Sequence, residues 1–173
     1  GGIYVEGESI FTLTSFSRNK AKTYTIYSQP GFGTYGGGAH TRGRTTFDRC
    51  RFGGNVCETS AHFQTPDPSF AVGGGLRHIE GAATLANCLF HENSVIAYRW
   101  PNLAGSAIAN RGAMTLANCT VTGNIGAPAL DNTGGTLAVD SSILFFNNKS
   151  GPQISGIASC TYSDIELGAS GAG

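Results

Sequence analysis

Apolar and polar residues follow one pattern that recurs five times along the chain. A large apolar residue is followed three positions later by asparagine, as in Phe16-x-x-Asn19, Phe52-x-x-Asn55, Phe90-x-x-Asn93, Val121-x-x-Asn124 and Leu144-x-x-Asn147. Five positions before each of these stands another large apolar residue: Phe11, Phe47, Leu85, Leu116 and Val139. Two positions before stands a small one: Thr14, Cys50, Cys88, Cys119 and Ser142. Because one such unit cannot bury its own apolar face, the repeat predicts a solenoid of stacked units.

The short length of the unit indicates strands rather than helices. Val121 to Leu144 spans 23 residues and Leu144 to Ile165 spans 21, whereas helical repeats need roughly 33 to 47. Apolar residues alternate with period two, and the alternation slips by one at Asp48-Arg49, so the chain must bend there. The equivalent bends are Ala86-Asn87 and Ala117-Asn118. The pattern predicts that each coil contains a strand, a bend, a second strand, an Asn-marked turn and a third strand.

Stacking places equivalent residues of successive coils about 4.8 Å apart, in columns. Burial of each large apolar side chain in these columns contributes roughly 1.5 to 3 kcal/mol. We expect the asparagines to sit in a turn, where they tolerate left-handed backbone and their amides bridge successive coils. We expect Cys50, Cys88 and Cys119 to be buried free thiols, since parallel neighbouring side chains disfavour a relaxed disulfide. A column of alternating charge is expected before the corner glycines: Glu6, Arg42, Glu80 and Arg111.

Two segments carry a resemblance to a known family. They are GGGLRHIEGAATLANCLFHEN at residues 73–93 and GSAIANRGAMTLANCTVTGN at residues 105–124. They resemble the repeats of right-handed parallel β-helix proteins of the pectin-lyase-like superfamily, in its secreted and surface members. The resemblance implies an all-β, right-handed parallel β-helix of about six coils of about 22 residues. It says little about function, because this fold carries lyases, hydrolases, adhesins and structural rods.

Composition agrees with a solenoid of tight turns. Charged residues make up 13% of the chain and glycine 26 of its 173 residues. The net charge of zero gives no indication of a nucleic acid or an anionic membrane as partner. We expect no membrane insertion, because no apolar run approaches the roughly 18 residues of a membrane helix. Residues 1–173 are expected to form one domain, a segment of a longer protein located outside the cell or at its surface.

Insertions lengthen the first three coils. The spacing between units is 36, 38 and 31 residues before it falls to 23 and 21, and the excess follows the marker asparagine at residues 22–35, 57–72 and 96–104. We expect these loops to lie side by side and to bind sugar rings or partner subunits through their aromatic and basic residues. The candidate binding residues are Tyr24, Tyr27, Tyr35, His62, Phe63, Tyr98, Arg99 and Trp100. The alternative is that these aromatics pack on one another and cover the flank.

Catalysis has weaker support in the sequence. The acidic motifs of pectate lyases and galacturonases are missing, and the nearest constellation is Arg77-His78-x-Glu80 with Arg42 beside it. Hydrolysis of a glycosidic bond needs two carboxylates facing one cleft, and a partner for Glu80 would have to be Glu58 or Glu92. No C-x-x-C or His-Cys spacing suggests zinc. We therefore predict no catalytic residues, no metal and no cofactor, with a polysaccharide lyase or hydrolase as the alternative.

One outward face carries small residues. Thr46, Thr84 and Thr115 are expected to point away from the core, with Asp48, Ala86 and Ala117 beside them on the same face. Such a face resembles those of ice-binding β-helices, which makes ice binding a minor alternative, or it packs on another protein. Two sequons, Asn118-Cys119-Thr120 and Asn148-Lys149-Ser150, are candidate glycosylation sites, and we expect Asn148 to be used more readily.

The favoured function is that of an extracellular structural or adhesive β-helix. Repeat sequence is already running at the first coil, and no capping helix is evident after the last. Open solenoid ends expose strand edges and an apolar cross-section. We expect either flanking sequence or another copy of the chain to cover them, and head-to-tail stacking of copies would give a filament.

Overall fold

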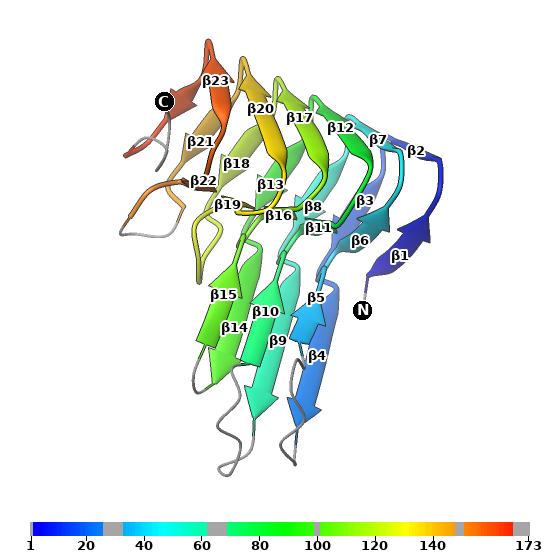
Figure 1. The fold of residues 1–173 in the computed structure, drawn as a ribbon, viewed down its shortest axis with the longest axis vertical. Coiled ribbons are helices and arrows are strands. Elements are labelled where there is room, and N and C mark those ends of the chain that lie inside the picture. The colour runs from blue at the N-terminus through cyan, green and yellow to red at the C-terminus, as the bar shows by residue number, and fades with distance from the viewer. Residues whose placement is uncertain (1, 26–32, 62–68, 99–100, 148–150, 168–173) are drawn as a thin grey trace.

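The computed structural model describes residues 2–25, 33–61, 69–98, 101–147 and 151–167. These residues form five parallel β-sheets, in which strands from successive coils lie side by side (Figure 1). Strand β1 lies at one end of the stack and strands β22 to β24 lie at the other (Figure 1). The expected all-β parallel solenoid of about six coils is therefore confirmed.

Three six-stranded sheets form the part of the solenoid that we name the body. Sheet A contains β1 (Ile3–Glu6), β6 (Ala39–Arg42), β11 (Leu76–His78), β16 (Ile108–Asn110), β19 (Leu130–Asn132) and β22 (Ile154–Gly156). Sheet B contains β2 (Ser9–Thr12), β7 (Thr45–Asp48), β12 (Ala82–Ala86), β17 (Ala113–Ala117), β20 (Thr136–Asp140) and β23 (Ser159–Thr161). Sheet C contains β3 (Ser15–Ser17), β8 (Arg51–Gly53), β13 (Leu89–His91), β18 (Thr120–Thr122), β21 (Ile143–Phe145) and β24 (Asp164–Ile165).

The insertions in the first three coils form two further sheets, which we name the wing. Sheet D contains β4 (Lys20–Thr25), β9 (Val56–Ala61) and β14 (Ser94–Tyr98). Sheet E contains β5 (Gly33–Tyr35), β10 (Ser69–Val72) and β15 (Pro101–Ala104). In Figure 1 these strands extend downward from the body and return to it. The insertions were expected to be loops lying side by side. Their position is confirmed, but much of their length is regular strand, because the parallel pairing of the body continues past the asparagine turn.

The two apolar columns have the expected register. Phe11, Phe47, Leu85, Leu116 and Val139 pair in order across sheet B, and Cys160 of the last coil continues the column. In sheet C the column of Phe16, Phe52, Phe90, Val121 and Leu144 ends at Ile165. The rings of Phe52 and Phe90 stack with their centroids 4.4 Å apart and their planes 3° apart. Both side chains are fully buried, so the columns form the core of the body.

The asparagine column is a continuous hydrogen-bonded ladder. The side-chain amide of Asn55 donates to Oδ1 of Asn93 at 2.9 Å, and the amide of Asn93 donates to Oδ1 of Asn124 at 2.9 Å. Each amide also donates to a backbone carbonyl of the preceding coil, as Asn93 does to Phe52 at 2.9 Å. One expectation was wrong: the left-handed residue of the turn is the one before each asparagine. Asparagine instead uses its side chain to replace the backbone hydrogen bonds that the turn interrupts.

The cysteines of the small-residue column are buried free thiols, as expected. Cys88 Sγ donates to the carbonyl of Ala86 at 3.2 Å, and Cys119 Sγ donates to that of Ala117 at 3.4 Å. Cys57 is buried in the wing, where burial raises the pKa of its thiol to about 12. With this pKa the Cys57 thiol carries almost no thiolate near neutral pH, and it is chemically unreactive.

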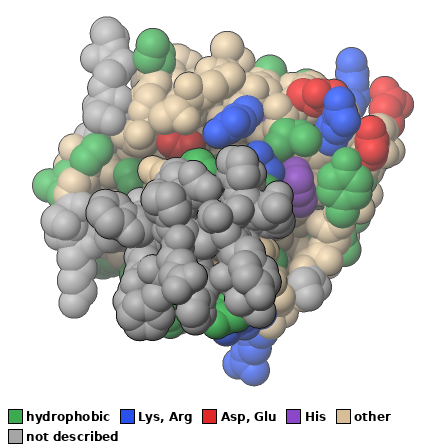
Figure 2. All heavy atoms as spheres, turned by 60° about the horizontal axis from the view of Figure 1, so that its bottom comes forward, with side chains coloured by type: hydrophobic (Ala, Val, Ile, Leu, Met, Phe, Trp, Pro, Cys, Tyr) green, Lys and Arg blue, Asp and Glu red, His purple; other side chains and the backbone are tan. Residues whose placement is uncertain are grey.

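The charged column is only partly confirmed. Arg42 lies between Glu6 and Glu80, and its guanidinium donates to both oxygens of Glu80 at 2.7 and 3.1 Å. Figure 2 shows acidic and basic side chains gathered at one edge of the face it displays. Among the described ion pairs, however, none joins Glu80 to Arg111. The backbone amide of Ile79 donates to the carbonyl of Thr41. Three residues, 79–81, therefore join sheet A to sheet B in this coil, whereas only Arg111 and Gly112 do so in the next coil. The extra residue shifts Glu80 out of register with Arg111.

Candidate functional site

The outer face of sheet D presents a charged cluster from neighbouring strands. Because side chains alternate along a strand, Lys20, Lys22 and Tyr24 of β4 share this face. The carboxylate of Glu58 on β9 lies 2.5 Å from Lys20 Nζ and 2.7 Å from Lys22 Nζ. Hydrogen bonds from Lys20 and Lys22 hold the pKa of Glu58 below its ordinary value. Two lysines for one carboxylate leave this patch with a net positive charge.

Two exposed tyrosines stand farther along the same face. Tyr24 pairs with Ser60 of β9, and Ser60 pairs in turn with Tyr98 of β14. The rings therefore flank a small residue, on strands about 9.6 Å apart. Tyr24 is 58% exposed and Tyr98 is 56% exposed. The structure thus brings together two of the aromatic residues that the sequence proposed for binding, on strands rather than on loops.

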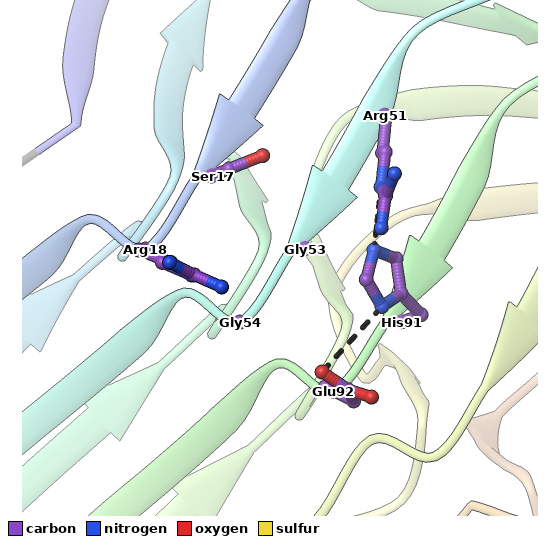
Figure 3. A pocket seen from close by; sticks show the side chains of 7 residues that line it. All are labelled: Ser17, Arg18, Arg51, Gly53, Gly54, His91 and Glu92. Carbon is purple, nitrogen blue, oxygen red and sulfur yellow. Dashed lines mark hydrogen bonds and ion pairs between the residues drawn. The ribbon is translucent and has the colours of Figure 1, made fainter.

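A hollow of about 340 Å³ lies where sheet C turns into sheet D. Its floor is formed by two glycines of the second coil, Gly53 and Gly54. Ser17 and Arg18 of the first coil lie on one side, and His91 and Glu92 of the third coil lie on the other (Figure 3). A Cβ atom on Gly53 would lie 2.2 Å from His91 Nε2, so glycine is what admits the imidazole ring at this point.

The polar groups of the hollow are arranged around one imidazole. Arg51 Nε donates to His91 Nε2 at 2.7 Å, which requires His91 to accept at Nε2. His91 Nδ1 lies 3.8 Å from a carboxylate oxygen of Glu92 (Figure 3). The Arg18 guanidinium extends over Gly54, with its Cγ 3.7 Å from the position of a Cβ there (Figure 3). The hollow therefore carries two guanidinium groups and one carboxylate.

The sequence analysis did not identify this hollow. Arg18 and Arg51 were not among its candidate residues, and the alignment of Gly53 with His91 becomes visible only once the coils are in register. The informative signal was the Gly53-Gly54 pair, which stands where the other coils have side chains on at least one position.

The remaining predicted binding residues separate into two groups. Tyr35 packs against the Arg77 guanidinium, whose carbon lies 3.7 Å from the ring centroid, so one face of this ring is occupied within the protein. Tyr27, His62, Phe63, Arg99 and Trp100 lie outside the described residues. Asn148 also lies outside them, whereas Asn118 is exposed in the bend before β18 with a φ of 52°.

The constellation considered for hydrolysis is not assembled. Arg77 faces outward on β11, whereas His78 is buried and accepts or donates a hydrogen bond at 3.0 Å with Thr41. Glu80 lies at the corner between sheets A and B, where Arg42 binds it. Its proposed partners, Glu58 and Glu92, lie on sheet D and at the turn between sheets C and D. These carboxylates do not face one cleft.

The threonine face has the expected register. Thr46, Thr84 and Thr115 pair across sheet B, and Ala138 and Ser159 continue the column. Asp48 and Asp140 lie in the neighbouring column, with Ala86 and Ala117 between them. The small-residue face is therefore interrupted by Asp48 in the second coil and by Asp140 in the fifth coil.

These features define a parallel β-solenoid with a basic hollow and an aromatic pair on its first three coils. Within the described ranges, no cluster of three or more His, Cys, Asp or Glu residues is spaced to hold a metal ion. The part of the chain that the structure describes contains no helix long and apolar enough to cross a membrane. Comparison with protein-family models found no matching family, and comparisons with curated proteins and with solved structures found no significant match.

Proposed function

We propose that this protein is an adhesive β-solenoid of the extracellular space or cell surface that binds glycans without cleaving them. The observation that carries the proposal is the pair of exposed tyrosines, Tyr24 and Tyr98, on the outer face of sheet D. Tyrosine rings bind sugars by stacking and by hydrogen bonds from the hydroxyl, and lose little conformational freedom when they do so. Parallel strands hold the two rings at a fixed spacing, which reduces the entropy that binding costs.

The rest of the molecule suits a scaffold. The stacked phenylalanines and the asparagine ladder give a rigid body on which the wing is mounted. The parallel β-helix and the repeated segments at residues 73–93 and 105–124 support membership of the pectin-lyase-like superfamily, in its non-catalytic surface branch. The separation of Glu80 from the other two carboxylates supports binding over hydrolysis.

A glycan panel tests this function. We expect the protein to retain at least one class of oligosaccharide without releasing products, and the double variant Tyr24→Ala/Tyr98→Ala to lose about 10-fold or more in affinity. Tyr4→Ala is the matched control, because Tyr4 is another 58% exposed tyrosine but lies on sheet A. The function is wrong if no glycan binds, or if the control reduces binding as much as the double variant.

Self-association is a second candidate function, because the two terminal coils expose apolar side chains. Phe11 and Cys160, at the two ends of the sheet B column, are less buried than Phe47 in its middle. A second copy stacked end to end would continue the columns and give an open filament. Light scattering at increasing concentration tests this: growing mass supports a filament, and a constant monomer mass excludes it.

A further inference from the structure

The residues that line the hollow at the turn between sheets C and D favour a charged ligand. Arg18, Arg51 and Glu92 converge on it, together with the hydroxyl of Ser17 and the imidazole of His91 (Figure 3). Arg51 uses only Nε in its hydrogen bond to His91, so the donors on its two terminal nitrogens are available to a ligand. Arg18 makes no ion pair with another described residue. Two guanidinium groups with unused donors form a site for an oxyanion, which arginine recognises with two parallel hydrogen bonds.

The carboxylate of Glu92 adds a second requirement. A small inorganic anion would be repelled by it, whereas a ligand that carries hydroxyl groups beside its anionic group would donate hydrogen bonds to it. The volume of about 340 Å³ is at the small end of ligand sites, which suits one unit of a polymer rather than a large ligand. Sugars with a carboxylate or a sulfate ester combine these properties.

We propose that the hollow binds one acidic sugar unit, with its carboxylate or sulfate group between Arg18 and Arg51 and a hydroxyl group on Glu92. This inference rests on the proposed glycan-binding function and adds the ligand's charge and the position of its charged unit. It differs from the expectation drawn from the net charge of zero, because the basic residues are concentrated locally: Lys20 and Lys22 follow Arg18 along the chain within four residues.

The direction of the ligand follows from the strands. Gly54 in the floor of the hollow is six residues before Ser60, which lies between the two tyrosines. At about 3.3 Å per residue this is roughly 20 Å of strand. A chain that occupies both the hollow and the tyrosine pair therefore contains several sugar units and crosses the Lys20–Glu58–Lys22 cluster. Longer oligosaccharides should bind more tightly than single units.

The test uses variants that remove charge and preserve the local fold. Arg18 has a φ of 55°, so Arg18→Asn retains a residue that tolerates the left-handed turn. Arg51→Gln removes the positive charge and retains a polar side chain with hydrogen-bond donors. Arg44→Gln is the matched control, because Arg44 is a 76% exposed arginine on the opposite side of the bend, before sheet B. Circular dichroism and a melting curve establish that each variant is folded.

Calorimetry with three probes measures binding: a sulfated, a carboxylated and a neutral oligosaccharide of the same length. We expect one or both acidic probes to bind more tightly than the neutral one, and each Arg variant to weaken that binding about 10-fold while Arg44→Gln leaves it unchanged. The two acidic probes distinguish a sulfate from a carboxylate source.

Three results would overturn the proposal. Equal binding of neutral and acidic probes would show that the hollow does not discriminate between charged and neutral sugars, although the proposed glycan-binding function would stand. Equal losses in Arg44→Gln and in the hollow variants would show non-specific attraction. Binding of all three probes that is lost only in the Tyr24→Ala/Tyr98→Ala variant would place the whole ligand on sheet D.

Discussion

In the body, the interior is filled by columns of phenylalanine, leucine and valine, whereas the wing encloses a much smaller set of side chains. Sheets D and E meet over Cys57, Ala71, Val95 and Ala127, with Leu103 partly buried against them. Thr59 is also fully buried there, and its hydroxyl has no partner among the described residues. Since apolar burial scales with area, the wing is the less stable region and depends on the body for its position. The same pairing pattern thus supports a rigid scaffold and a weaker ligand-bearing extension.

Truncation in the two cores should show the largest contrast. Phe90→Ala removes a fully buried ring from the body and should lower the free energy of unfolding by about 3 to 5 kcal/mol. Val95→Ala in the wing should cost about 1 to 2 kcal/mol, at roughly 0.8 kcal/mol for each group removed. Urea denaturation measures both. Equal costs would contradict the difference between the two cores.

The asparagine ladder offers a comparison between its middle and its end. Asn93→Ala breaks bonds to Asn55, Asn124 and Phe52 in a buried turn and should destabilise the protein by about 2 to 4 kcal/mol. Asn19→Ala, at the half-buried end of the ladder, loses only the bond from its side-chain amide to Asn55 Oδ1 and keeps the bond from its backbone amide to the same oxygen, so it should cost about 1 kcal/mol. Thermal melts of the two variants would contradict the ladder's role if Asn19→Ala were the more damaging.

Acid should weaken the body before the wing. Burial, then the charges of Arg77 and His78, lowers the pKa of His40 to about 4, so the unfolded chain takes up this proton first. Stability from His40 is present above about pH 6.5 and is lost as the pH falls toward 4, by about 2 kcal/mol after allowance for solvent screening. The lowered pKa of Glu58 affects the wing at lower pH. The stability that this carboxylate contributes to the folded protein is present above about pH 4.3 and is lost as the pH falls below that. Denaturation at pH 7.5, 5 and 3 separates these windows.

The control for the acid effect is His40→Asn, which has no proton to gain. This variant should flatten the change in stability between pH 6.5 and 4 and leave the change below pH 4 intact. If stability in the variant fell with pH between 6.5 and 4 as steeply as in the parent chain, another titratable group would be responsible for the effect.

The smallest expected effect comes from the unpartnered hydroxyl in the wing. Thr59→Val replaces a buried polar group by an apolar one of similar shape and should stabilise the wing by about 1 kcal/mol. Thr45→Val is the counterpart in the body, where the hydroxyl is likewise buried and unpartnered. Proteolysis near the wing reports the first variant and global unfolding reports the second. Destabilisation by Thr59→Val would mean that its hydroxyl has a partner.

The repeat predicted the body in detail because period and register are local properties of the sequence. The positions of Phe52, Phe90 and Asn93 follow from spacing alone. The strands of the wing escaped prediction because their apolar residues, such as Ala71 and Cys57, are too small to stand out. The hollow escaped because it depends on which residues meet across coils, and on the absence of side chains at Gly53 and Gly54.

Hydrogen exchange with and without a bound acidic oligosaccharide tests the account most directly. The account places the ligand on the outer faces of sheets C and D in the first three coils. We predict slower exchange in peptides that cover residues 15–24, 51–60 and 89–98, and unchanged exchange in residues 113–117 and 136–140 of sheet B. Protection confined to sheet B, or no protection under conditions where binding is measured, would contradict the assignment of these coils as the binding surface.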